Sequence, residues 1–182
     1  MKLNEMTYTV RARIEIGKLA GGHSMKEFFD TLGKSNDEEK TTNLLIDAVE
    51  IMHNAWLRKQ AQEKNEEFAP AQLDREAFMD LTTEEWNKVE DAILEQIKKD
   101  SGVTIETEPV SKKKGNRGGK RELTPPWILF YGLQIGLTKQ EVLDTRFGEM
   151  LDLISCFSIW NGGAKEKKQK KKFTYEEAIA LR

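Results

Sequence analysis

Apolar and polar residues alternate along the first part of the chain. The even-numbered positions are apolar: Tyr8, Val10, Ala12, Ile14 and Ile16. The odd positions between them carry threonine or charged residues. A period of two with β-branched residues predicts a half-buried strand over residues 8–16, which the following Leu-Ala-Gly-Gly sequence ends.

Three-to-four spacing of apolar residues predicts two long helices after this segment. In the first, residues 35–60, one face carries Leu44, Leu45, Ala48, Val49, Met52, Ala55 and Trp56. The second spans residues 81–102. Thr82 and Glu85 form a capping box at its start. The positive charges of two lysines near its end interact favourably with the helix dipole.

Two shorter helices are predicted beside the long ones. Ser24 and Glu27 form a capping box before a helix that Gly33 is expected to end. Pro70 suits the first turn of another helix, over residues 71–81.

A break in periodicity divides the chain at a lysine- and glycine-rich segment. Residues 103–120 show no period, and their glycines and lysines predict a flexible linker over residues 111–122. Residues 1–110 then form a helical domain, and residues 123–163 form a small helical module that begins near Pro125 and Pro126. Residues 164–182 are a lysine-rich tail with a short helix. The predicted fold is mainly α, with a short β element in the N-terminal domain.

The net charge of −2 conceals an asymmetry between the two parts of the chain. Residues 1–110 carry 14 basic and 23 acidic side chains, and residues 111–182 carry 15 basic and 8 acidic ones. There is no apolar run of the length that spans a membrane, and the N-terminus lacks the apolar core of a signal peptide. We therefore expect a cytoplasmic protein that does not contact a membrane.

The chemistry of an enzyme is not evident in this sequence. His23 and His53 belong to no metal-binding motif. Cys156 lies among apolar residues, which predicts a buried and unreactive thiol. No glycine-rich pattern for binding phosphate is present. We predict no catalytic residue, no metal site and no cofactor.

Nucleic-acid binding is an alternative that the basic clusters keep open. One flexible segment brings together Lys112, Lys113, Lys114, Arg117, Lys120 and Arg121. Such side chains can neutralise phosphates, but no aromatic residues are interleaved with them to stack on bases. A solvated linker is the favoured explanation of the cluster, and nucleic-acid binding is the alternative.

Large apolar residues are concentrated in the module after the linker. The candidate contact residues are Trp127, Phe130, Tyr131, Phe147, Met150, Leu151 and Ile154. A module of this size is too small to bury all of this surface by itself. These side chains therefore pack against the N-terminal domain as core or form a partner-binding surface, and the sequence leaves both readings open.

The layout of the chain resembles the tail assembly chaperones of long-tailed bacteriophages, in the extended form made by ribosomal frameshifting. The N-terminal part, up to the "ILEQIKKDSG" sequence, looks like the shorter form of such a chaperone. The "PPWILFYGLQIGLTKQEVLDTRFGEMLDLI" sequence resembles the extension. The "KKKG" sequence then has a second explanation, because adenine-rich lysine codons can form the slippery site of a frameshift.

This resemblance implies a non-catalytic function during virion assembly. The N-terminal domain would coat the tape-measure protein, and the extension would recruit tail-tube protein. Many copies would act together, so homo-oligomers are compatible with this reading. The protein would act in the host cell cytoplasm and be absent from the mature virion.

Overall fold

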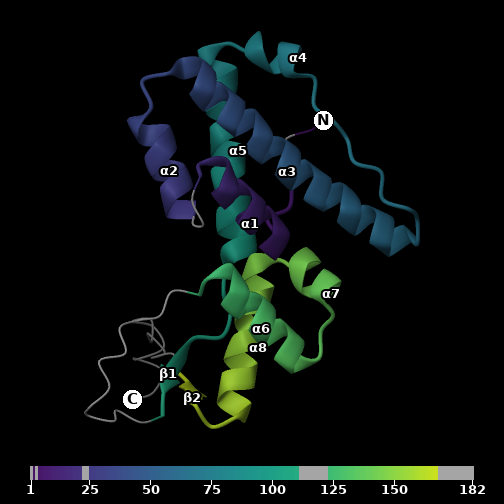
Figure 1. Ribbon diagram of the computed structural model, residues 1–182, viewed down its shortest axis with the longest axis vertical. Coiled ribbons are helices and arrows are strands. Elements are labelled where there is room, and N and C mark those ends of the chain that lie inside the picture. Colours follow the sequence, from purple (N-terminus) through teal and green to yellow (C-terminus); the bar gives the residue numbers. More distant parts are fainter. Residues whose placement is uncertain (1, 3, 22–24, 111–122, 168–182) are drawn as a thin grey trace, which may run out of the picture.

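The computed structural model describes residues 2, 4–21, 25–110 and 123–167, and this part of the chain is mainly helical (Figure 1). It contains a small sheet of β1 (Thr107–Pro109) and β2 (Ala164–Glu166). The helices are α1 (Val10–Leu19), α2 (Met25–Lys34), α3 (Glu38–Lys64), α4 (Arg75–Met79), α5 (Thr83–Ser101), α6 (Pro125–Ile135), α7 (Lys139–Asp144) and α8 (Phe147–Trp160). The predicted mainly α fold is confirmed.

The strand predicted over residues 8–16 is wrong, because this segment forms α1. Val10 packs in one hydrophobic cluster with Ile14 against it, whereas Ala12 and Ile16 pack in another. Residues four apart lie on the same side of a helix, and residues two apart lie on nearly opposite sides. Two apolar pairs on opposite sides therefore reproduce the alternation of a strand. The hydroxyl of Thr9 accepts a hydrogen bond from the backbone N–H of Ala12 at 3.2 Å and caps the helix.

The two long helices form where apolar spacing predicts them. The seven face residues predicted for α3 are all buried except Trp56, which is half-buried. The capping box of Thr82 and Glu85 is present at the start of α5. The carboxylate of Glu85 accepts hydrogen bonds from the Thr82 side chain and backbone, and these lower its pKa below the ordinary value.

The boundaries of the two shorter helices differ from the prediction. Gly33 lies inside α2, which continues to Lys34, while the predicted cap at Ser24 lies outside the described residues. Pro70 belongs to an extended segment before α4 and does not start a helix. The carboxylate of Asp74 caps α4 instead, accepting a hydrogen bond from the backbone N–H of Ala77 at 3.2 Å.

Two hydrophobic clusters form the core, one in each half of the molecule. The first lies among α1, α2, α3 and α5, with Tyr8 and Phe28 as its largest fully buried side chains. The second joins α6, α7 and α8 around Ile128, Val142 and Met150, and Val10 of α1 is part of it. The N-terminal segment therefore contributes to both clusters.

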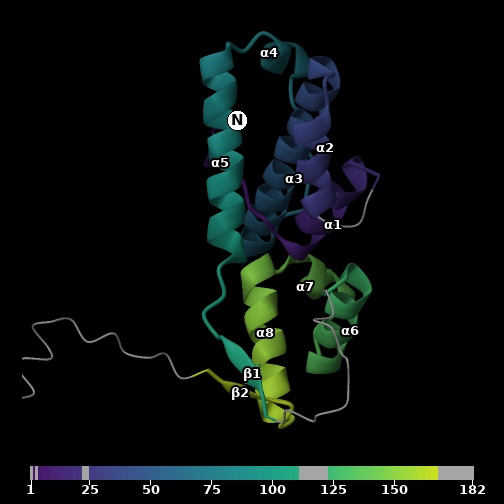
Figure 2. The same cartoon turned by 90° about the vertical axis from the view of Figure 1, so that its left-hand side faces the viewer.

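Backbone hydrogen bonds along residues 7–10 connect the two halves. The N–H of Thr7 donates to the carbonyl of Met52 in α3 at 3.1 Å, and the N–H of Val10 donates to the carbonyl of Thr145 at 3.0 Å. The carbonyl of Tyr8 accepts from the N–H of Phe147, at the start of α8, at 3.2 Å. In Figure 2, α8 begins close to the end of α5.

The sheet was not expected, because residues 103–120 show no periodicity. β1 and β2 pair antiparallel, with Thr107 opposite Glu166. Lys165 and Glu108 form an ion pair at 3.0 Å, and Lys167 and Glu106 form another at 2.9 Å. The sheet thus pairs a segment that precedes residues 111–122 with one that follows α8.

Asp152 of α8 fixes the chain between α5 and β1. Its carboxylate accepts hydrogen bonds from the Thr104 hydroxyl at 2.6 Å and from the backbone N–H of Ile105 at 2.9 Å. Burial alone would raise the pKa of Asp152. The hydrogen bonds from Thr104 and Ile105 outweigh it, so that the pKa lies below its ordinary value.

Gly148 lies where α8 closely approaches the end of α5, so a substitution at this position tests the packing. A Cβ atom at position 148 would lie 2.2 Å from the backbone oxygen of Gly102 and 2.9 Å from the backbone carbonyl carbon of Ser101. Because backbone cannot rotate away, we expect Gly148→Ala to lower the free energy of unfolding by about 1–3 kcal/mol, measured in urea. Gly33→Ala is the matched control, since nothing lies within 4 Å of its added Cβ. Equal stability of the two variants would contradict this packing.

The stability of the protein should also depend on the charge of Asp152. A carboxylate whose pKa is lowered by folding stabilises the folded state above its unfolded pKa of about 4, and this contribution is lost as the pH falls through the folded value. We expect Asp152→Asn to cost about 1 kcal/mol at neutral pH and to flatten the loss of stability in acid. Urea unfolding between neutral and acidic pH measures both effects. Asp91→Asn, at an exposed position of α5, should change neither the stability at neutral pH nor its loss in acid.

Candidate partner-binding surface

Two segments of the C-terminal half carry no charged residue. These are residues 125–135, which form α6, and residues 153–164, which include the second half of α8. The two helices pack against each other, and Figure 1 shows them side by side. Side chains that remain exposed along both helices therefore form a surface with little electrostatic cost of desolvation.

Prolines and glycines set the position of α6. Pro125 and Pro126 occupy its first positions, where a backbone N–H has no helical partner. Gly136 ends the helix with a left-handed φ of 98°. A Cβ atom on Gly132 would lie 2.2 Å from a methyl carbon of Val142, so the glycine allows α7 to approach α6 closely. The side of α6 that carries Ile128 and Gly132 is thereby turned inward.

Several large apolar side chains of this half of the molecule remain exposed. Trp127 is 39% exposed, Phe130 47%, Leu133 53% and Trp160 85%. The ring centroids of Trp127 and Phe130 are 5.6 Å apart, and Tyr131 connects them to Phe157 of α8, 6.5 Å away. These six residues, Trp127, Phe130, Tyr131, Leu133, Phe157 and Trp160, are called the aromatic face below.

A hollow of about 560 Å³ lies beside the aromatic face. Phe130, Tyr131 and Phe157 line one part of it, and Thr107 and Ala164 of the small sheet line another. The remaining lining residues are Gln134, Ser158, Asn161 and Gly163. A mainly apolar wall with a few amide and hydroxyl groups is suited to a side chain of a partner protein.

The predicted contact residues divide between the core and the surface. Trp127 and Phe130 are exposed and Tyr131 is half-buried, so they are placed to meet a partner. Met150 and Ile154 are buried in the second cluster, which corrects their reading as contact residues. They point inward because α8 turns this side toward α1, α6 and α7.

The other two predicted contact residues are half-buried. Phe147 packs edge-on against Tyr8, with ring centroids 5.9 Å apart, and the guanidinium of Arg13 lies 4.7 Å from its ring centroid. Phe147 therefore belongs to the junction between the two clusters. Leu151 is half-buried on α8.

The prediction omits Leu133, Phe157 and Trp160 from the contact residues. Helical spacing did not single them out, because apolar residues occur on all sides of both helices. The absence of charge over residues 125–135 and 153–164 is the sequence signal that could have found them. Cys156 is exposed, so its predicted burial is wrong: the buried positions of α8 are Gly148, Met150 and Ile154, on a different side.

The described part of the chain contains no group of three or more residues able to hold a metal ion. His53, in α3, lies with Nδ1 2.7 Å from the carbonyl oxygen of Glu5, and its ring stacks on that of Trp56. This histidine is a structural residue that attaches the N-terminal segment to α3. His23 lies outside the described residues.

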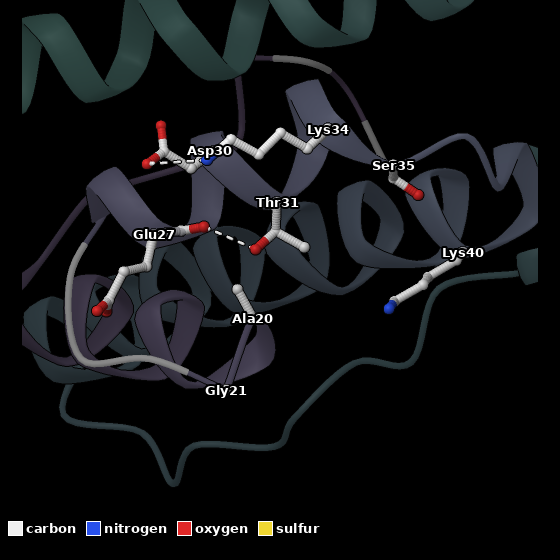
Figure 3. Close-up of a pocket in the computed structure, with 8 residues that line it drawn as sticks. All are labelled: Ala20, Gly21, Glu27, Asp30, Thr31, Lys34, Ser35 and Lys40. Carbon is white, nitrogen blue, oxygen red and sulfur yellow. Dashed lines mark hydrogen bonds and ion pairs between the residues drawn. The ribbon is translucent and has the colours of Figure 1, made fainter.

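A second, polar hollow of about 530 Å³ lies between the end of α1, α2 and the start of α3 (Figure 3). Its charged groups include Asp30 and Lys34, which pair with each other at 3.9 Å. The Thr31 hydroxyl donates to the backbone carbonyl of Glu27 at 2.8 Å. The hollow holds exposed charges of both signs and no nucleophile paired with a base, so we assign it no chemistry.

The predicted nucleic-acid cluster, Lys112, Lys113, Lys114, Arg117, Lys120 and Arg121, lies outside the described residues. The described residues after α8 include two lysines. Lys165 forms an ion pair with Glu108, and Lys167 forms one with Glu106. The hydrogen bond and charge of Glu106 raise the pKa of Lys167. These two lysines therefore serve the small sheet.

No helix among the described residues has the length and apolar character needed to cross a membrane. No protein-family model matches the chain, and no curated protein or solved structure is significantly similar to it.

Proposed function

We propose that the protein is a non-catalytic assembly chaperone of a long-tailed bacteriophage, and that its aromatic face is a protein-binding surface. The single observation that carries this proposal is the exposure of Trp127, Phe130, Leu133 and Trp160 on two neighbouring segments without charged residues, α6 and the second half of α8. Exposed apolar patches of this kind mark interaction sites on folded proteins.

The composition of the aromatic face favours a protein partner over a small ligand. Tryptophan and tyrosine are enriched among the residues that dominate binding energy at interfaces. The most exposed ring, Trp160, belongs to the last turn of α8 and faces solvent over 85% of its surface. An interface would bury this ring, whereas a small ligand in the neighbouring hollow would leave most of it in water.

The resemblance supplies the identity of the partners. The aromatic face lies within residues 123–163, the part that resembles the extension of a tail assembly chaperone. We therefore assign to it the recruitment of tail-tube protein, and to the N-terminal helices the coating of the tape-measure protein. The site of action is then the host cytoplasm, and the chaperone leaves before the virion matures.

Substitution of exposed aromatic residues should separate binding from folding. We expect Phe130→Asp and Trp160→Asp to keep the helical circular dichroism spectrum and the melting temperature within a few degrees, because both side chains are largely exposed. Each should lower co-purification with tail-tube protein by at least about tenfold, since a charge in a desolvated interface is costly. The measurement is a pull-down after co-expression with the neighbouring tape-measure and tube proteins.

Two variants serve as controls for this experiment. Met79→Asp changes an apolar side chain of α4 that is 43% exposed and outside the aromatic face, and it should bind as the wild type does. Met150→Asp places a charge in the second cluster and should unfold the C-terminal half. The wild-type protein could instead fail to bind either phage protein and bind nucleic acid with strong salt dependence. This result would contradict the proposal and favour the alternative function.

A further inference from the structure

An apolar groove lies among α2, α3 and α5, far along the chain from the aromatic face. Its floor is formed by Phe28, Leu45 and Ile93, which are 0%, 7% and 2% exposed. Phe29 and Leu94 line its edges and are 38% and 50% exposed. The groove has a volume of about 300 Å³, and Leu32, Gly33, Thr41 and Glu90 complete its lining.

The groove exists because α5 stands apart from α2. Figure 2 shows α5 on one side of the molecule and α2 with α3 on the other. Gly33 adds to the opening, because it has no side chain and nothing lies within 4 Å of where a Cβ would be. The groove therefore leaves apolar side chains of three helices accessible in a concave surface.

The lining of the groove includes one carboxylate. Glu90 is the charged residue of the lining, and among the described residues it forms no ion pair. The part of the chain that forms the groove, residues 1–110, carries 23 acidic and 14 basic side chains. The excess of carboxylates makes a positively charged partner favourable at this position.

We propose that this groove binds an amphipathic helix of a partner protein, one that carries an apolar stripe with basic residues beside it. Apolar side chains spaced three and four residues apart enter the groove between Phe29 and Leu94, as in other helix-in-groove complexes. The basic residues of the partner helix lie beside Glu90. A helix from residues 1–110 of a second copy is disfavoured, because that part of the chain carries the same excess of negative charge.

The proposed function assigns the N-terminal helices to the tape-measure protein without naming a site, and this inference names one, while the peptide experiment tests the groove by itself. The groove is built from residues 28–94, whereas the aromatic face is built from residues 127–160. Either surface can bind its partner if the other is unused. Variants of the two surfaces therefore fail independently.

A designed peptide tests the groove without knowledge of the natural partner. The probe is a fluorescein-labelled helix of about 18 residues, made of leucines at helical spacing and lysines. A matched peptide carries glutamates in place of the lysines. By fluorescence anisotropy with the full chain, we expect the leucine–lysine peptide to bind at least about tenfold more tightly than the leucine–glutamate peptide.

Gly33 provides a variant that fills the groove, because nothing lies within 4 Å of where its Cβ would be. We expect Gly33→Trp to weaken binding of the leucine–lysine peptide by at least about tenfold and Gly33→Ala to leave it within about twofold. Glu90→Lys should weaken binding of the leucine–lysine peptide and strengthen binding of the leucine–glutamate peptide. If Gly33→Trp does not fold by circular dichroism, Leu94→Lys replaces it, because Leu94 is already half-exposed.

Phe130→Asp distinguishes the groove from the aromatic face, and it should leave peptide binding unchanged. Equal affinity for the two peptides, or binding that survives both Gly33→Trp and Leu94→Lys, would overturn the proposal. So would loss of binding in Phe130→Asp. A wild-type dimer that Gly33→Trp converts to a monomer on size-exclusion chromatography would show that a second copy occupies the groove, and would also overturn it.

Discussion

The carboxylate of Asp100 is the point on which the arrangement of the two halves depends. It lies at the end of α5 with its side chain 1% exposed. Its oxygens accept hydrogen bonds from the backbone N–H of Tyr8 at 2.7 Å and from Gln96 at 2.6 Å, and Arg146 lies 3.5 Å away. One buried charge thus joins the N-terminal segment, α5 and the start of α8. A buried carboxylate without these partners would be strongly destabilising.

At this junction α1 lies between the two hydrophobic clusters and packs against both. Tyr8 is buried in the first cluster and meets Phe147 at the start of α8. Burial raises the pKa of the Tyr8 phenol far above its usual range, although the nearby charge of Arg13 opposes this, so the ring remains neutral. Because α1 supplies apolar side chains to both clusters, it holds the C-terminal helices against the N-terminal ones. In this arrangement Met150 is buried and Trp127 stays exposed.

The molecule presents two apolar surfaces of different character. The aromatic face is formed by α6 and the second half of α8, which carry no charged residue, and it offers large exposed rings. The groove is concave and has one charged lining residue, Glu90. A surface without charge discriminates by shape and area, whereas a groove with a charged lining residue also selects by the sign of the partner. Two binding surfaces on one small chain would allow it to connect two partners.

The sequence by itself determined the long helices and their starts, because these depend on contacts within one or two turns. The apolar stripe of α3 and the capping box at Thr82 are local features, and both are present. Tertiary structure decided what distant residues do to one another. The alternation over residues 8–16 became a helix because both of its sides found apolar partners, and β1 formed because residues 164–166 returned to pair with it. Likewise, apolar residues on α8 became core or surface only through the packing of α1, α6 and α7 against one side of that helix.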